Sequence, residues 1–185
     1  MSSKYRIFDR SALRILPLAE RKHDLEISNW LSLESETPPF EHPDLKVLAD
    51  RIRAARAQNR AVILIMGAHV LRTGVNRHLI DMIERGWISH IAFNGAGAIH
   101  DYELARIGAT TESVARYIRE GQFGLWQETG ELNDWIREAA SLELGLGEYV
   151  GRRIAESDYP YRDLSVFAAA WRAGIPATVH VGVGY

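Results

Sequence analysis

An unbroken apolar run at residues 61–66, with the sequence AVILIM, constrains the fold more than any other segment of this chain. A strand with one solvated face alternates apolar and polar residues, and this run does not alternate. Such runs are typical of strands covered on both faces, which occur in parallel sheets flanked by helices. Gly67 ends the run. We therefore expect an α/β fold built around a parallel sheet.

The rest of the chain alternates between helix and strand patterns. A second apolar segment at 87–93 leads into a glycine-rich turn, and a last strand is expected at 177–181. The order of strand, helix, strand, several helices and strand predicts a Rossmann-like parallel sheet with helices on both faces. From their period and their glycine stops, helices are expected at about 44–59, 79–86, 100–107, 111–120, 131–143, 145–156 and 163–173.

Two features define the expected domain organisation. Residues 1–43 show no clear period and end in a segment, 37–43, that holds three of the six prolines. Proline fixes its own φ and favours an extended residue before it, so we expect an N-terminal extended arm over 1–43. The α/β domain then occupies 44–185. Because no helix follows the strand at 177–181, we expect this domain to be incomplete at its C-terminus, as the N-terminal portion of a longer protein.

Composition excludes several classes of protein. Lys and Arg number 22 against 24 Asp and Glu, so the net charge of −2 offers no basic surplus for nucleic acid. No apolar run approaches the roughly 20 residues of a membrane span, and the N-terminus has no signal-like apolar region. Cysteine is absent, which excludes disulfides and thiolate chemistry. We expect a cytoplasmic protein that binds neither nucleic acid nor membranes.

The turn at 94–98, with the sequence NGAGA, is the most informative segment for function. Glycines between a strand and a helix let backbone N–H groups approach a ligand, and the helix N-terminus favours a phosphate or carboxylate. The Rossmann pattern G-x-G-x-x-G would require a third glycine where His100 stands. An ordinary strand-to-helix turn remains the alternative. The loop at 67–74 and the segment at 182–185 should meet this turn, because carboxyl ends of parallel strands share one edge.

Histidines recur near these strand ends. His100 precedes Asp101, and the two form a candidate catalytic pair for proton transfer near neutral pH. The alternative is that Asp101 simply offsets a helix dipole. His69, His100 and His180 together would suit a metal-dependent hydrolase, although the chain has no His-x-His or His-Glu-x-x-His motif.

Taken together, three segments resemble the deoxyhypusine synthase family, in particular its bacterial branch. These segments are the strand at 61–66 with Thr73-Gly74 after it, the stretch FNGAGAIHD at 93–101, and the helix and Ile-Pro at 165–176. The resemblance implies a Rossmann-like fold, a transferase or oxidoreductase activity with NAD as cofactor, a small-molecule substrate, and a homotetramer with sites between subunits. The candidate cofactor-binding residues are Gly67, Thr73, Gly74, Asn94, Gly95, Ala96 and Gly97.

The departures from that family alter the expected chemistry. The paired glutamates that hold the polyamine correspond to Ile99 and His100, so the local negative charge is lost. The family's lysine motif is absent, so the chain should not be a working deoxyhypusine synthase, and a neutral or anionic substrate is expected. A non-catalytic fragment or assembly subunit is the alternative. We further expect Gly97→Val to block phosphate approach while the fold survives.

Overall fold

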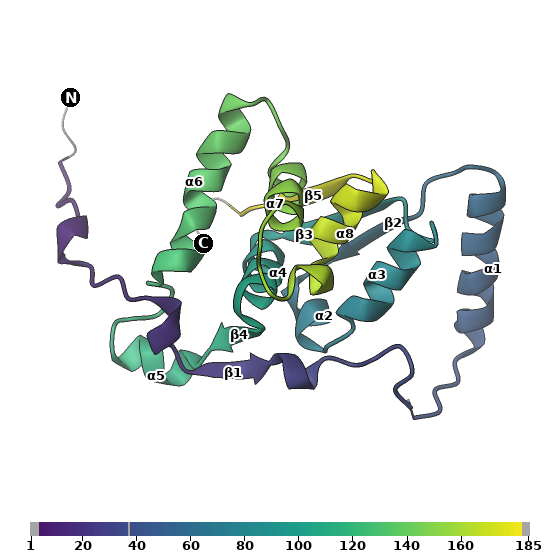
Figure 1. Ribbon diagram of the computed structural model, residues 1–185, viewed down its shortest axis with the longest axis horizontal. Helices are drawn as coiled ribbons and strands as arrows, with labels where there is room; N and C mark the ends of the chain where they lie inside the picture. The colour runs from purple at the N-terminus through teal and green to yellow at the C-terminus, as the bar shows by residue number, and fades with distance from the viewer. Residues whose placement is uncertain (1–3, 37, 183–185) are drawn as a thin grey trace.

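The computed structural model describes residues 4–36 and 38–182, and a three-stranded parallel sheet lies at its centre (Figure 1). The strands lie in the order β2-β3-β5, so β3 is central. The register places Met66 opposite Phe93 and Asn94 opposite His180. The expected α/β class with a parallel sheet is therefore confirmed. The strands span Ile63–Met66 (β2), His90–Asn94 (β3) and Ala177–His180 (β5).

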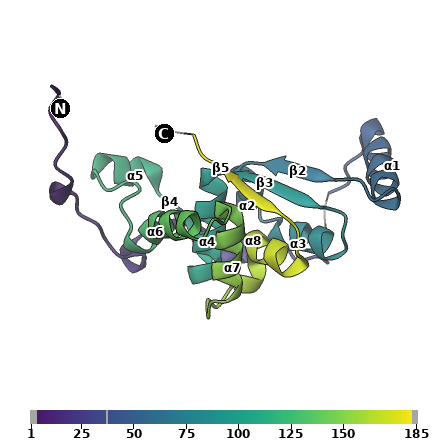
Figure 2. The ribbon, with the colours of Figure 1, turned by 90° about the horizontal axis from the view of Figure 1, so that it is seen from above.

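The helices that contact this sheet lie on one of its faces. Figure 2 shows α3, α4, α7 and α8 gathered on one side of the strands. A parallel crossover is right-handed in nearly all proteins, and both crossovers here step in the same direction across the sheet. Helices were expected on both faces, and this sequential strand order instead places them on one. The helices span Pro43–Ala57 (α1), Ala68–Arg72 (α2), Asn76–Glu84 (α3), Gly95–Ile107 (α4), Val114–Arg119 (α5), Gln127–Ser141 (α6), Leu146–Ala155 (α7) and Val166–Ala173 (α8).

The hydrophobic core fills the space between the covered face of the sheet and these helices. The ring of Phe93 stacks on that of Phe167 in α8, with centroids 4.5 Å apart. Gly147 lets α7 approach β5 so closely that a Cβ at this position would collide with the carbonyl oxygen of Ala177. The last strand is therefore covered on this face by a helix that precedes it in the sequence. The expectation that it lacks a covering helix is wrong for that face, and residues 183–185 lie outside the described residues.

The N-terminal segment is joined to the domain by a strand pair that the sequence did not reveal. Strand β1 (His23–Glu26) pairs antiparallel with β4 (Ala109–Glu112). This pairing explains why the helix expected at 111–120 begins only at Val114. Short 3-10 helices lie at Arg10–Ala12, Leu18–Glu20, Ile27–Asn29 and Arg162–Leu164.

Helix α1 lies at the side of the molecule and packs loosely. None of its residues is buried, and the guanidinium of Arg56 lies over the ring of Trp87, 4.4 Å from its centroid. It is drawn at the far end from the N-terminus in Figure 1. No helix within the described ranges is long and apolar enough to cross a membrane.

Candidate functional site at the carboxyl edge of the sheet

The ends of all three parallel strands meet at one edge. Asn94 ends the central strand, and His180 lies opposite it in register at the end of β5. Gly67 follows β2, and a Cβ there would lie 3.4 Å from the side-chain nitrogen of Asn94. The strand order contains no reversal, so this edge has no topological switch point of the doubly wound kind. A ligand crevice must instead be formed by the helices beside the edge.

Helix α4 begins directly at this edge. Asn94 is its N-cap, and the side-chain Oδ1 accepts a hydrogen bond from the N–H of Gly97 at 2.9 Å. The N–H groups of Gly95 and Ala96 have no partner within the helix, as in any first turn. Ala96 is exposed to solvent. The first turn of α4 therefore presents backbone donors and the positive end of the helix dipole at the edge of the sheet.

Gly97 faces the core rather than the edge. A Cβ at this position would lie 2.5 Å from Cδ1 of Phe93, on the strand below. Its φ is not in the left-handed region. Gly97 thus serves the close packing of helix on strand that the missing third glycine of the Rossmann pattern would provide. The expectation that Gly97→Val spares the fold is wrong, because valine would displace a core aromatic ring.

A hollow of about 330 Å³ opens beside the first turn of α4. This volume lies within the range of small-ligand sites, which are mostly apolar with a few polar groups. A larger hollow of about 500 Å³ lies near the opposite end of β5, around Pro176, away from the glycine-rich turn. Residues lining the smaller hollow include Gly95, Ile99, Thr129, Asn133, Val179 and Val181.

The loop after α2 packs against the N-terminal segment. Thr73 donates its hydroxyl proton to the carbonyl of Val70 at 2.7 Å. Gly74 has a φ of +83°, and its carbonyl accepts a hydrogen bond from Leu31 N–H at 2.9 Å. A Cβ at Gly74 would lie 2.5 Å from the carbonyl oxygen of Asn29. These contacts account for the glycine without a ligand.

His100 and Asp101 take different partners. Asp101 is fully buried and accepts hydrogen bonds from Ser165 Oγ at 2.5 Å and from the N–H of Val166 at 2.8 Å. It therefore caps the start of α8, rather than orienting its neighbour. Burial raises the pKa of Asp101 to about 6, although these hydrogen bonds oppose the rise. Nδ1 of His100 instead contacts Thr110 Oγ1 at 2.6 Å.

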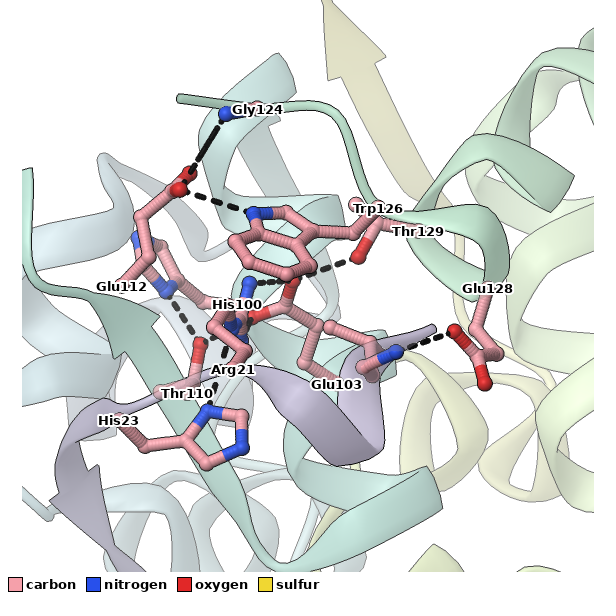
Figure 3. A network of polar contacts seen from close by, with 11 residues as sticks. Arg21, His23, His100, Glu103, Thr110, Glu112, Gly124, Trp126, Glu128 and Thr129 are labelled. Atoms are coloured by element: carbon pink, nitrogen blue, oxygen red, sulfur yellow. Dashed lines mark hydrogen bonds and ion pairs between the residues drawn. The ribbon is translucent and has the colours of Figure 1, made fainter. Parts of the chain in front are cut away.

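His100 belongs to a polar network that links α4 with β4, α6 and the N-terminal segment (Figure 3). Glu103, one turn further along α4, accepts two hydrogen bonds from the guanidinium of Arg21, at 2.7 and 2.6 Å. Thr110 from β4 and Thr129 from α6 donate to the same carboxylate at 2.8 and 2.7 Å. The network thus ties the N-terminal segment to α4 and reaches the hollow through Thr129.

The two ionisable side chains that α4 contributes to this network, Glu103 and His100, take different charge states. Burial would raise the pKa of Glu103. The hydrogen bonds and positive charge of Arg21, together with the hydrogen bonds from the two threonines, instead hold this pKa below its usual value. Burial lowers the pKa of His100 to about 4, against the attraction of Glu103. Glu103 is therefore ionised and His100 neutral near pH 7.

The three histidines near the strand ends do not form a metal site. His180 shares a hydrogen bond with Thr178 at 2.9 Å, and Nε2 of His69 lies 3.5 Å from Nη1 of Arg72. Within residues 4–36 and 38–182, no group of three or more His, Asp or Glu side chains is placed to hold a metal ion. The metal-dependent hydrolase is therefore not supported.

Sequence reasoning missed Arg21, Glu103, Thr110 and Thr129. A usable signal existed for Glu103, because it lies three residues after His100 and so shares its face of the helix. A charged residue within the otherwise apolar stretch from Tyr102 to Ala105 also indicates a buried partner. Arg21 gave no signal, because its approach depends on the pairing of β1 with β4.

Comparisons with known proteins correct the family resemblance. The model of the arginine dihydrolase ArgZ-like C-terminal Rossmann fold matches residues 46–127. This match overturns the resemblance to deoxyhypusine synthase and the functions inferred from it. Glycine-rich turns after buried strands recur in unrelated dinucleotide-binding proteins, which explains the error. No curated protein matches the chain.

Three solved structures are similar to this chain at low identity, and one of them, unliganded AgrE, has a TM-score above 0.5. Unliganded AgrE is 18% identical with a TM-score of 0.52, and the match covers 80% of this chain and 21% of that one. ArgZ, an arginine dihydrolase from the ornithine–ammonia cycle in cyanobacteria, is 18% identical with a TM-score of 0.49. The match covers 80% of this chain and 20% of the ArgZ chain. AgrE in a ternary complex with ornithine and NAD+ is 19% identical with a TM-score of 0.49, and the match covers 80% of this chain and 21% of that one. This chain spans about a fifth of their length, and it is similar in sequence to a Rossmann-fold domain of ArgZ-like proteins.

Proposed function

We propose that this chain is an NAD-binding domain of the Rossmann type, which holds the pyrophosphate of the dinucleotide at the first turn of α4. The observation that carries the proposal is the position of that turn. It starts at the carboxyl end of the central strand, with Asn94 as cap and Ala96 exposed. Free N–H groups and the helix dipole at such a point favour a phosphate.

The surroundings of this turn fit a dinucleotide. Gly95 lies beside the hollow, and a Cβ there would approach Cγ1 of Val181 to 3.0 Å. The missing side chain therefore leaves room between the helix and the end of β5. The apolar walls of the hollow suit one ring system of the cofactor, while Thr129 and Asn133 supply polar groups at its rim.

The comparisons support the choice of cofactor class. The matching family is described as a Rossmann fold, and its match includes β2, β3 and α4. AgrE is a protein that has been captured with ornithine and NAD+. We accordingly propose that this domain works within an ArgZ-like protein and that its small-molecule substrate is an amino acid of the arginine and ornithine kind. The side chain of such a substrate is cationic, so this proposal replaces the neutral or anionic substrate expected from the sequence.

The test introduces a negative charge at the proposed phosphate site without harming the helix. In Ala96→Glu the carboxylate lies in the first turn, where it stabilises the helix dipole but repels a phosphate. The matched control is Ala96→Gln, which has the same size and no charge. We expect calorimetric titration with NAD+ to show an affinity loss of about tenfold or more for Ala96→Glu relative to Ala96→Gln. Equal affinities, or no binding by the wild type, would remove the proposal.

A further inference from the structure

Arg72, the last residue of α2, is a half-buried arginine that no acidic side chain of the described residues balances. Other arginines that are buried or half-buried each donate to an oxygen atom of the protein; they are Arg21, Arg77, Arg106 and Arg152. Within residues 4–36 and 38–182, the guanidinium of Arg72 donates to no oxygen. Its charge is therefore not neutralised by this part of the chain.

The guanidinium of Arg72 has one side against the protein and one side toward solvent. Nε is buried and has no hydrogen-bond partner among the residues that the structure describes. Nη2 also has no partner among them, but it is not buried and so remains accessible from solvent. Buried N–H groups in folded proteins are nearly always paired, and each exception calls for an explanation. The free donors of Arg72 indicate a partner that the chain itself does not supply.

The charges near Arg72 do not balance it. Burial lowers the pKa of His100, on the adjacent helix α4, to about 4. Among the charges that act on this ring, the acidic one is Glu103, and the basic ones are Arg72, Arg21 and His69. The carboxylate of Glu103 already accepts two hydrogen bonds from Arg21. The charge of Arg72 therefore remains in excess, which favours an anion at this place.

The side chain of Arg72 extends back toward the carboxyl edge of the sheet. Helix α2 begins at Ala68, directly after β2, and the side chains of a helix lean toward its N-terminus. His69 belongs to the first turn of α2, and Nη1 of Arg72 lies 3.5 Å from Nε2 of His69. The guanidinium is therefore held beside the turn that follows β2, at the edge where Gly67 also meets Asn94.

We propose that Arg72 anchors a binding site for an oxyanion on α2, beside His69. The planar N–H fork of a guanidinium matches the paired oxygens of a carboxylate or of a phosphate group. Two sources of such a group fit the proposed function, namely the carboxylate of an amino acid of the arginine and ornithine kind and a phosphate group of the dinucleotide. We take the amino acid as the ligand, because the first turn of α4 already provides for the pyrophosphate. This choice rests on the proposed function, whereas the oxyanion site itself does not.

The test compares probes that differ in the carboxylate, using NMR titrations of the whole chain that follow the ring of His69. We expect ornithine to shift these resonances, and putrescine, which is ornithine without its carboxylate, to leave them unchanged. Inorganic phosphate is the third probe. A response to phosphate alone supports the oxyanion site and overturns the choice of an amino acid. No response to either anion, or equal responses to ornithine and putrescine, would overturn the proposal.

Substitutions of Arg72 then assign the binding to its side chain. Arg72→Gln should weaken ornithine binding about tenfold or more, and Arg72→Lys, which keeps the charge but loses the fork, should restore part of the affinity. The matched control is Arg85→Gln on α3, which removes the same charge from an exposed arginine paired with Asp81. An equal loss of affinity in Arg72→Gln and Arg85→Gln would overturn the proposal. If Arg72→Gln fails to fold, Arg72→Lys and the comparison of ornithine with putrescine still decide the question.

Titration of the same variants with NAD+ separates this proposal from the proposed function. We expect Arg72→Gln to keep the NAD+ affinity of the wild type while it loses ornithine. A wild type that binds ornithine through Arg72 but does not bind NAD+ contradicts the proposed function and supports the oxyanion site. A wild type that binds NAD+ but neither ornithine nor phosphate overturns the oxyanion site and leaves the dinucleotide site intact.

Discussion

The two faces of the parallel sheet differ sharply in their environment. On the covered face, Phe93 is 1% exposed and packs among the helices. On the open face, Ile63 and Ile65 of β2 are 55% and 79% exposed, although they belong to the same apolar run. The run therefore does not distinguish the two faces. An apolar residue in a parallel strand is buried only where a crossover helix passes over it.

The open face carries polar groups on its other strands. His90 Nε2 lies 3.1 Å from Thr178 Oγ1, which in turn lies 2.9 Å from Nε2 of His180. These three residues share a face, because the register pairs Ala92 with Thr178 and side chains alternate along a strand. The open face is thus half apolar and half polar, unlike the core side. Substitutions on the two faces should differ accordingly.

The largest difference is expected for large-to-small substitutions. Phe93→Ala should lower the free energy of unfolding by about 3–5 kcal/mol, because it leaves a cavity next to Phe167. Ile65→Ala, on the open face, should change it by no more than about 0.5 kcal/mol. Chemical denaturation of both variants measures the contrast. A comparable loss for Ile65→Ala would mean that the open face is covered in solution.

A substitution that adds one carbon tests how tightly the covered face is packed. Gly147→Ala should lower the free energy of unfolding by about 3 kcal/mol, because the new methyl group meets the backbone of Ala177. Gly145→Ala is the matched control in the preceding turn, where a Cβ meets nothing within 4 Å. Thermal melts of the two variants should separate clearly. Similar melting temperatures would contradict the close approach of α7 to β5.

Asp101 makes the free energy of unfolding depend on pH. Its pKa in the folded chain is raised to about 6 by burial, above the ordinary value of 3.8. The stabilising contribution of the protonated form is therefore complete below about pH 4 and is lost as the pH rises through 6. The free energy of unfolding of the wild type, relative to Asp101→Asn, should fall by roughly 1–3 kcal/mol between pH 4 and 7. A difference in unfolding free energy between the wild type and Asp101→Asn that is the same at every pH would contradict this assignment.

The smallest effect on stability is expected for a charge on the open face. Ile65→Lys should change the free energy of unfolding by no more than about 0.5 kcal/mol, because the side chain already lies in solvent. The homotetramer that the family resemblance implied is tested with the same variant, which should weaken association if subunits meet through this face. Sedimentation velocity over a range of concentrations measures it. Unchanged association of Ile65→Lys would assign self-contact to another surface.

The family resemblance suggested by the sequence shows that local motifs predict local geometry but not the family. The glycine-rich turn after β3 and the cap by Asn94 were readable, because local geometry demands small residues and a side-chain acceptor at such a turn. The family inferred from them was wrong, because the same local demands arise in every protein that places a helix after a buried strand. Site residues taken from the strand ends lie where expected for Asn94 and Gly95. Gly74 packs on the N-terminal segment instead, and Thr73 bonds back to Val70.

The sequence by itself determined the class of fold, the three parallel strands and most of the helices. The apolar run at 61–66 predicted a strand of the parallel sheet, and periodicity predicted the helices. Gly108 and Gly174 end two of these helices in the left-handed conformation. These are local properties, since each depends on a few neighbouring residues. The edge at which strands end together also followed, because parallel strands have one carboxyl side.

Only the tertiary structure decided the strand order, the partners of buried charges and the role of Gly97. The order β2-β3-β5 fixes the side on which right-handed crossovers place their helices, and so leaves Ile65 exposed. Arg21 and Glu103, which are 82 residues apart in the sequence, meet because β1 pairs with β4. Contacts of this kind depend on packing across the whole chain, and no local pattern encodes them.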